Sequence, residues 1–213
     1  MKASFELIEV GGFIAAIEGM RYPTKSIGDS LLNPCKNLPT DTCLVLGPKD
    51  IKLATGLIQK GPVHGKFQRG VCAWFSINIP IAVWSELDTY IVGVDMISSE
   101  STMYTLIKEC GNITEDMFVD GTSKSTIEYF KKQVDEFTLE YGSRKEIPID
   151  KIKYALPGGW LQKRNRGFSY QCLASMYRDR KDHRLNIWPE VICKSIEQLP
   201  YFKELILGVS DAN

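Results

Sequence analysis

Residues 61–104 read GPVHGKFQRGVCAWFSINIPIAVWSELDTYIVGVDMISSESTMY. Every second residue from Val71 to Ile79 is apolar, which is the period of a strand with one face packed inward. Pro80 removes a backbone donor and ends that strand, and the apolar spacing of residues 81–91 then predicts a helix. Because a polar cluster follows the strand and the helix, we expect this stretch to form one wall of a binding site.

The polar cluster begins after Gly93. Its hydroxyl and carboxylate groups are dense enough to bind a ligand that is rich in polar atoms. The alternative is an ordinary solvated loop, in which the same side chains would contact only water. The candidate ligand contacts in and just before this cluster are Asp88, Tyr90, Glu100, Ser101 and Tyr104.

The length and composition of the chain predict a single domain, residues 1–213. With 213 residues, 44% of them hydrophobic, the chain can bury a sizeable core. Its formal net charge is zero, so no global field attracts a polyanion, and we expect no general binding to nucleic acid. Any recognition of phosphate therefore requires a local cluster of basic residues.

The six cysteines are scattered and form no CxxC pair, and we expect no secretory leader. We interpret them as reduced thiols of a cytoplasmic protein. No apolar run approaches the roughly 20 residues that a membrane-spanning helix needs. With only two histidines and no HExxH motif or calcium-binding loop, we expect no metal site built by the protein alone. The sequence also has no GxSxG or SxxK motif, which disfavours a serine hydrolase.

Apolar residues are also regularly spaced in the part of the chain before residue 61. Apolar residues from Phe5 to Val10, separated by glutamates, predict a first strand, and residues 13–20 predict a short helix after a Gly-Gly turn. Residues 50–59 predict a helix that Gly61 ends. Arg21 follows the first helix in a polar segment and is a candidate contact for an anionic ligand. The alternative is an ordinary surface arginine.

A long amphipathic helix is predicted from Ser125, where Glu128 completes a capping box. Ile127, Phe130 and Val134 have helical spacing and share one face, while charged residues occupy the other. We therefore interpret this stripe as part of the core.

The segment that starts at Arg164, RNRGFSYQCLASMYRDRKDHRLNIWPE, has helical spacing and is rich in arginine. Guanidinium groups arranged within about two turns of a helix can bind phosphate or carboxylate through bidentate hydrogen bonds. The alternative is a set of surface ion pairs, because Asp179 and Asp182 interleave with the basic residues. The basic candidates here are Arg178, Arg180, Lys181, His183 and Arg184.

Three blocks of the chain, in this order, resemble the flavin-dependent thymidylate synthases. The first, DIKLATGLIQKGPVHGKF at residues 50–67, places His64 where that family has a histidine close to the flavin. The second is residues 74–104, in which Ser101 matches the serine of the family's signature. The third is KYALP, which begins at Lys153, followed by the helix that carries Arg178; together these resemble the family's substrate-phosphate region.

The resemblance implies an α/β fold with a central sheet and flanking helices. It also implies a homotetramer whose inter-subunit pockets bind a nucleotide-type ligand. The family's signature is Arg-His-Arg, seven residues and a serine, but this chain has Ile91-Val92-Gly93 in place of the basic triad. These residues cannot donate charge-assisted hydrogen bonds, and Ser99 and Met103 replace a further glutamate and arginine of the family. We therefore expect no flavin cofactor and no catalytic turnover.

The segments WSELDTYIVG, SSESTMY and MYRDRKDHRLNIWPEVICKSIEQLPYF also resemble an uncharacterised group of proteins encoded by bacteriophages of Gram-positive bacteria. Our first hypothesis is a protein that sequesters a nucleotide-derived immune signal in the host cytoplasm without turnover. The second is a divergent enzyme that uses FAD to transfer a methyl or hydroxymethyl group to a pyrimidine nucleotide. The third is an interaction protein that kept the fold after losing its pocket.

Overall fold

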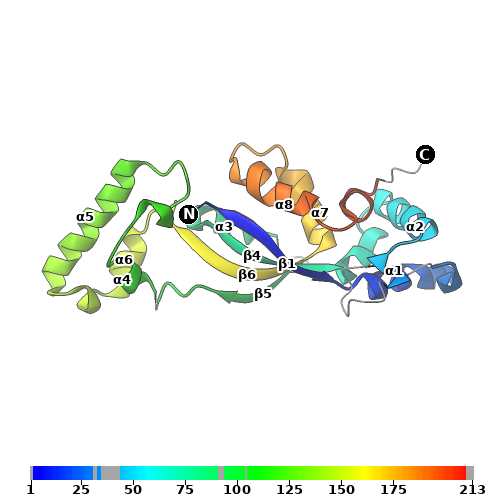
Figure 1. Ribbon diagram of the computed structural model, residues 1–213, viewed down its shortest axis with the longest axis horizontal. Helices are drawn as coiled ribbons and strands as arrows, with labels where there is room; N and C mark the ends of the chain where they lie inside the picture. The colour runs from blue at the N-terminus through cyan, green and yellow to red at the C-terminus, as the bar shows by residue number, and fades with distance from the viewer. Residues whose placement is uncertain (1, 31–32, 35–43, 91–93, 104, 210–213) are drawn as a thin grey trace. The chain divides into compact units, whose positions relative to one another are not determined.

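The computed structural model describes residues 2–30, 33–34, 44–90, 94–103 and 105–209 (Figure 1). Its strands are β1 (Ser4–Gly11), β2 (Asn33–Pro34), β3 (Leu44–Val45), β4 (Cys72–Pro80), β5 (Val94–Ser99) and β6 (Leu161–Ser169). Its α-helices are α1 (Phe13–Arg21), α2 (Pro48–Gln59), α3 (Ile81–Leu87), α4 (Leu106–Glu109), α5 (Lys124–Tyr141), α6 (Ile149–Ala155), α7 (Tyr170–Arg180) and α8 (Lys194–Glu197). Short helical turns are η1 (Tyr22–Thr24), η2 (Ile27–Asp29), η4 (Gly65–Gly70), η5 (Glu115–Met117), η6 (Arg144–Glu146), η7 (Trp188–Cys193) and η8 (Phe202–Leu207).

The main sheet contains four strands in the order β1-β4-β6-β5, and β2 pairs with β3 in an antiparallel two-stranded sheet. The strand predicted from Val71 to Ile79 is confirmed as β4. Its alternate residues Ala73, Phe75 and Ile77 are fully buried, because successive side chains of a strand point to opposite faces. The predicted α/β class, with a sheet and flanking helices, is confirmed.

The chain divides into two compact units. The α5 unit comprises Met1–Ser4, Ile77–Thr89 and Ile97–Asn165. The α7 unit comprises Phe5–Ser76, Tyr90–Met96 and Arg166–Asn213. The expectation of a single domain over residues 1–213 stays a prediction.

The core of the α5 unit forms around the predicted apolar stripe of α5. Ile127, Phe130 and Val134 are at most 5% exposed. The indole of Trp160 meets the rings of Phe118 and Phe130 edge to face, with centroids 5.3 and 5.9 Å apart. Such geometry matches the positive edge of one ring to the negative face of the other. The interpretation of this stripe as core is confirmed.

The start of α5 differs from the predicted capping box. Ser123 is the N-cap residue, and its hydroxyl oxygen accepts a hydrogen bond from the backbone N–H of Thr126. Ser125 already lies inside the helix, so the box predicted between Ser125 and Glu128 is wrong. The sequence contains three hydroxyl residues within four positions, and only the extended backbone of Ser123 identifies the cap.

The core of the α7 unit is built from rings on β1, β4 and β6. Phe5 and Phe75 have centroids 4.4 Å apart, and both contact Phe168, at 6.0 and 6.1 Å. Phe13 at the start of α1 meets the ring of Tyr170 edge to face at 5.7 Å. The contact of Phe13 fixes the start of α1 against the start of α7.

The helix predicted from Arg164 begins only at Tyr170, because residues 161–169 form β6. Gly167 allows this strand to lie against Trp74, since a Cβ at this glycine would be 2.8 Å from the indole Nε1. Ser169 then caps the helix by accepting a hydrogen bond from the N–H of Cys172. The spacing of apolar residues in α7 extends by chance into the strand, so periodicity alone misplaced the boundary.

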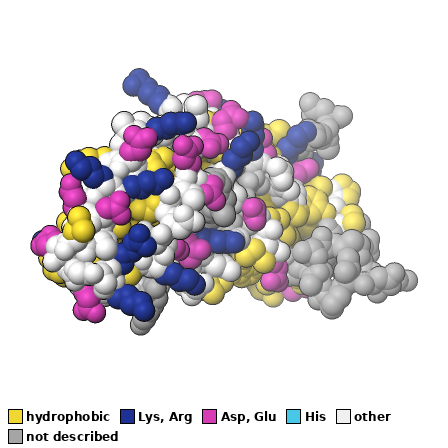
Figure 2. Space-filling view, turned by 60° about the vertical axis from the view of Figure 1, so that its left-hand side comes forward, with side chains coloured by type: hydrophobic (Ala, Val, Ile, Leu, Met, Phe, Trp, Pro, Cys, Tyr) yellow, Lys and Arg dark blue, Asp and Glu magenta, His cyan; other side chains and the backbone are white. Residues whose placement is uncertain are grey.

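Two further boundaries differ from expectation. The helix predicted over residues 81–91 ends at Leu87. Part of the predicted polar cluster is strand β5, which ends at Ser99. Within the described residues no helix is long and apolar enough to cross a membrane. Figure 2 shows basic and acidic side chains interspersed over the face that it presents, as the balanced composition predicts.

Candidate functional site

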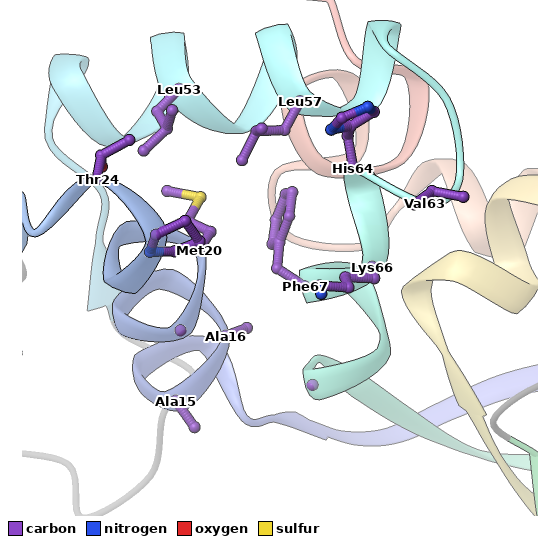
Figure 3. A pocket seen from close by; sticks show the side chains of 13 residues that line it. Ala15, Ala16, Met20, Thr24, Leu53, Leu57, Val63, His64, Lys66 and Phe67 are labelled. Atoms are coloured by element: carbon purple, nitrogen blue, oxygen red, sulfur yellow. The ribbon is translucent and has the colours of Figure 1, made fainter.

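A cavity of about 480 Å³ lies between α1, α2 and η4 in the α7 unit (Figure 3). We call it the chamber. Small residues on α1, among them Ala16 and Gly19, leave room on one side. Leu53 and Leu57 of α2 and Phe67 of η4 project into the space from the other sides (Figure 3). The wall is therefore mainly apolar, as in most sites that bind organic ligands.

The chamber stays open because the chain uses glycine where larger residues would fill it. Gly19 lines the chamber, and a Cβ at this position would meet no atom within 4 Å. Glycine inside a helix destabilises it by roughly 0.5–1 kcal/mol relative to alanine. This glycine therefore costs stability and leaves space in the chamber.

Two close contacts hold the chamber walls together. Gly12, with φ of 87°, precedes α1, and a Cβ there would lie 1.9 Å from the carbonyl oxygen of Gly70. A Cβ on Gly70 would in turn lie 3.2 Å from the Cβ of Ala16, so α1 and η4 pack backbone to backbone. Arg21 at the end of α1 is bound to Asp50 of α2, with 2.6 Å between Nη2 and Oδ1 and 2.7 Å between Nε and Oδ1.

The polar groups of the chamber lie at its edge. His64 precedes η4, is exposed and lies beyond Leu57, while Lys66 lies on η4 itself (Figure 3). Thr24 of η1 lies at the other end of the lining, beside Leu53 (Figure 3). An apolar wall with a few polar groups at the mouth can hold a flat ring and hydrogen-bond to its edge.

The basic end of α7 contains two different environments. The Arg180 guanidinium lies 4.6 Å from the ring centroid of Trp188, and its Nε donates to the Tyr90 hydroxyl at 3.0 Å. Its Nη1 is 2.8 Å from Nε2 of His183. Arg180 is therefore held by aromatic and imidazole groups of the protein. Such cation–π packing removes much of its freedom to approach a ligand.

Arg178 and Arg184 instead line an open depression on the surface of the α7 unit, together with Asp179 and Asp182. The side chain of Arg178 is 70% exposed, and its Nε donates to Asp179 at 3.2 Å. An exposed neighbour pair of this kind contributes little to stability. The guanidinium of Arg178 can therefore exchange this contact for a phosphate at low cost. Arg178 also borders a smaller hollow with Gln171 and Ser175.

The predicted residues of the α5 unit lie in separate local contacts. Asp88 pairs with Arg164 at 3.1 Å, and the Arg164 guanidinium lies 4.1 Å from the centre of the Trp84 ring. Glu100 accepts a hydrogen bond from the N–H of Lys163 at 2.9 Å. Lys153 contacts the sulfur of Met103, and the Ser101 carbonyl accepts a hydrogen bond from the Thr105 hydroxyl.

The structure thus brings together only part of the predicted set. Tyr90 and Arg180 are in contact, and Arg178 and Arg184 line one depression. His64 lines the chamber and does not line the depression that holds Arg178 and Arg184. Tyr104 and the segment Ile91-Val92-Gly93 lie outside the described residues. The ligand roles of all these residues stay predictions.

Sequence reasoning missed the apolar lining of the chamber. Met20, Leu53, Leu57 and Phe67 each have the spacing of ordinary core residues, so no pattern marks them as ligand contacts. The available signal was the run of small residues on one face of the first helix, which ends with Gly19. Within the described residues, no group of histidines, cysteines and carboxylates is arranged to hold a metal ion.

No family model and no curated protein matches this chain. Solved structures do match it along nearly its whole length. The thymidylate synthase ThyX of Helicobacter pylori, solved with FAD and dUMP, superposes with a TM-score of 0.69 at 16% identity over 96% of each chain. A second structure of this enzyme with FAD and dUMP gives the same TM-score at 15% identity, over 95% of this chain and 97% of the other.

A third match is the UMP/dUMP methylase PolB of Streptomyces cacaoi, solved with 5-Br dUMP. It has a TM-score of 0.63 and 13% identity, and the match covers 97% of this chain and 92% of the other. Identities this low establish the fold alone. The chain therefore has the fold of the flavin-dependent thymidylate synthases.

Proposed function

We propose that this protein binds a nucleotide-type ligand in the α7 unit and holds it without turnover. The observation that carries the proposal is the chamber, an apolar cavity with polar groups at its mouth in a fold whose solved members bind dUMP. The planar base or ring of the ligand would lie between Leu57 and Phe67. His64 would then hydrogen-bond to its edge.

The absence of turnover rests on the sequence. Ile91-Val92-Gly93 stands where the thymidylate synthase signature has its basic triad. Aliphatic side chains and glycine supply no charge-assisted hydrogen bonds to a flavin or to a developing charge. A protein that keeps the fold and a cavity but lacks these donors is suited to capture. The resemblance to bacteriophage proteins favours the sequestration of a nucleotide-derived immune signal in the host cytoplasm.

Contacts predicted from the sequence offer another location for the ligand, because the depression that Arg178 and Arg184 line shares no lining residue with the chamber. Arg178 and Arg184 on the open end of α7 would meet phosphate, and Tyr90 would pack beside it. The resemblance further predicts a homotetramer in which residues of neighbouring subunits, including Lys153, Glu100 and Ser101, reach the same ligand. These assignments are separate from the chamber and are tested separately.

A divergent flavin enzyme is the second candidate. The two Helicobacter structures contain FAD, and His64 lies at a cavity in this chain. Under this alternative FAD would bind through contacts other than the triad, and a pyrimidine nucleotide would receive a methyl or hydroxymethyl group. Purified protein that is yellow and stabilised by dUMP would favour it. An interaction protein without a ligand is the third candidate.

The deciding experiment fills the chamber. Gly19→Leu places an isobutyl group where a Cβ meets no atom, so the protein should fold and the ring site should be blocked. Gly19→Ala is the matched control, because it makes the same gain in helix propensity with only one added carbon. Calorimetry would compare dUMP, FAD, cyclic dinucleotides and ADP-ribose derivatives on all three proteins.

The expected result is binding of one colourless nucleotide by the natural chain and by Gly19→Ala, with loss of binding in Gly19→Leu. Thermal unfolding should show stabilisation by the same ligand, since a ligand that binds only the native state raises its stability. Nucleotide binding that survives in Gly19→Leu would exclude the chamber. Absence of any binding would leave the interaction protein as the conclusion.

A further inference from the structure

A second depression, of about 420 Å³, runs along α2 beside the chamber. We call it the groove. Lys49 and Lys52 of α2 and Lys60, which directly follows it, line one side, and Thr24 and Ser26 line the other. Residues 49, 52 and 60 fall on one helical face, because they are separated by three and by eight positions. At 1.5 Å per residue this row extends roughly 16 Å along the helix.

The groove carries more positive than negative charge. Lys49 is bound to Asp29 at 2.8 Å, but the two side chains are 67% and 51% exposed, and the pair is weak. The hydrogen bond and the charge of Lys49 hold the pKa of Asp29 below its usual range. Among the residues that the structure describes, neither Lys52 nor Lys60 has an ion-pair partner. These ammonium groups are available to an anion.

Gly56 gives the groove its depth. It lies inside α2 and lines the groove, and a Cβ there would meet no atom within 4 Å. It thus repeats on α2 what Gly19 does on α1, since each is a helical glycine facing open space.

The groove and the chamber share part of their lining. Thr24, Leu53 and Leu57 border both. One end of the combined site is therefore apolar, and the other is basic and carries the hydroxyl groups of Thr24 and Ser26, which hydrogen-bond to each other at 2.8 Å. Lysine is a common ligand of phosphate, as a mobile point charge, and hydroxyl groups donate to phosphate oxygens.

We propose that the groove binds the phosphate chain of a ligand whose ring lies in the chamber, which makes the ligand a nucleoside polyphosphate or a dinucleotide. This inference rests on the proposed function for the ring, but the groove can be tested alone. The spacing of the lysines favours two or more phosphates over one, because a single phosphate cannot reach ammonium groups distributed along the helix. Arg21 takes no part, because Asp50 already binds it.

Inorganic tripolyphosphate is the probe for the groove, measured by calorimetry on the full chain at several salt concentrations. Gly56→Glu places a carboxylate among the lysines, and Gly56→Gln is its neutral match; both are better helix formers than glycine. Lys132→Gln on α5 makes the same change of one unit in net charge far away in sequence. We expect Gly56→Glu to weaken binding about tenfold or more, whereas Gly56→Gln and Lys132→Gln should change it less than about threefold.

The proposal is overturned if tripolyphosphate does not bind, or if Gly56→Glu and Lys132→Gln weaken it equally. Gly19→Leu separates the two proposals because it blocks only the chamber. Retained tripolyphosphate binding in Gly19→Leu, with nucleotide affinity unchanged, supports the groove and removes the chamber. If Gly19→Leu loses nucleotide binding while Gly56→Glu leaves the affinity for tripolyphosphate unchanged, the chamber is supported and the groove is excluded.

Discussion

Arg21 and Asp50 form an ion pair whose side chains are only 3% and 0% exposed. The pair joins α1 to α2, the two helices between which the chamber lies. Nη1 of Arg21 also donates to the carbonyl of Ser26 at 3.3 Å, which ties the turn after α1 to the same site. Arg21, a candidate ligand contact in the sequence, is thus already bound within the protein.

Breaking this pair from one side should destabilise the protein strongly. Arg21→Ala leaves the Asp50 carboxylate buried without its cation, and loss of one partner of a buried pair costs about 3–5 kcal/mol. Denaturant unfolding should show a free energy of unfolding that is lower by this amount. The matched control is Arg21→Met with Asp50→Leu, which removes both charges and should recover most of the loss. A single variant as stable as the natural chain would contradict the structural role.

Periodicity predicted the elements whose residues alternate or repeat cleanly. β4 and α2 were found within one or two residues, because each buries one face. The strand β6 was missed, because Arg166 and Gly167 look exposed or flexible in sequence, yet Arg166 is buried over the ring of Phe168 and Gly167 is buried against Trp74 of β4. A local sequence pattern does not reveal which aromatic ring from a distant part of the chain will pack against a residue.

The candidate site was predicted less well than the fold. Charged residues are conspicuous in a sequence, so the basic end of α7 was identified, but the role of Arg180 as a packed residue against Trp188 was not. The chamber was not predicted, since a cavity is a property of several elements together. Its trace in the sequence is the run of small residues on the first helix, which ends with Gly19, a residue that a helix would otherwise avoid.

The N-cap of α5 offers a test with a built-in control. Ser123→Ala removes the acceptor of the Thr126 N–H and should lower stability by about 1 kcal/mol. Ser125→Ala, two residues away in the first turn, removes no cap and should be neutral or slightly stabilising, because alanine is the better helix former. Chemical denaturation of both variants would decide between them. An equal loss in both would restore the capping box predicted from the sequence.

Three buried thiols should resist modification in the folded protein. Burial raises the pKa of Cys110 to about 12, with a further effect of Glu109, and raises those of Cys172 and Cys193 to about 11. At pH 8 these three should react slowly with iodoacetamide, and half-buried Cys72 faster. Peptide mapping after timed labelling measures the rates. Rapid labelling of Cys172 in the native state would contradict its burial.

The same thiols should make the protein less stable as the pH rises above 9. Their pKa values in the folded state lie above the ordinary value of 9.0, so the folded state holds the protons more tightly. Their contribution is therefore complete below pH 9 and is lost as the pH rises toward 11 and 12. Unfolding midpoints measured from pH 8 to 11 should fall. A midpoint that rises over this interval would contradict the shifts.

Arg178 and Arg180 should separate binding from stability, although they are two residues apart on one helix. Arg178→Ala should weaken binding of a phosphorylated ligand by about 1–3 kcal/mol if the contact is direct, without changing the melting temperature, because its side chain is 70% exposed. Arg180→Ala removes the packing on Trp188 and the hydrogen bond to Tyr90, so it should lower the melting temperature first. Calorimetry and thermal unfolding on both variants give the comparison. Unchanged affinity in Arg178→Ala would remove this arginine from the site and leave the lysines of the groove as the phosphate contacts.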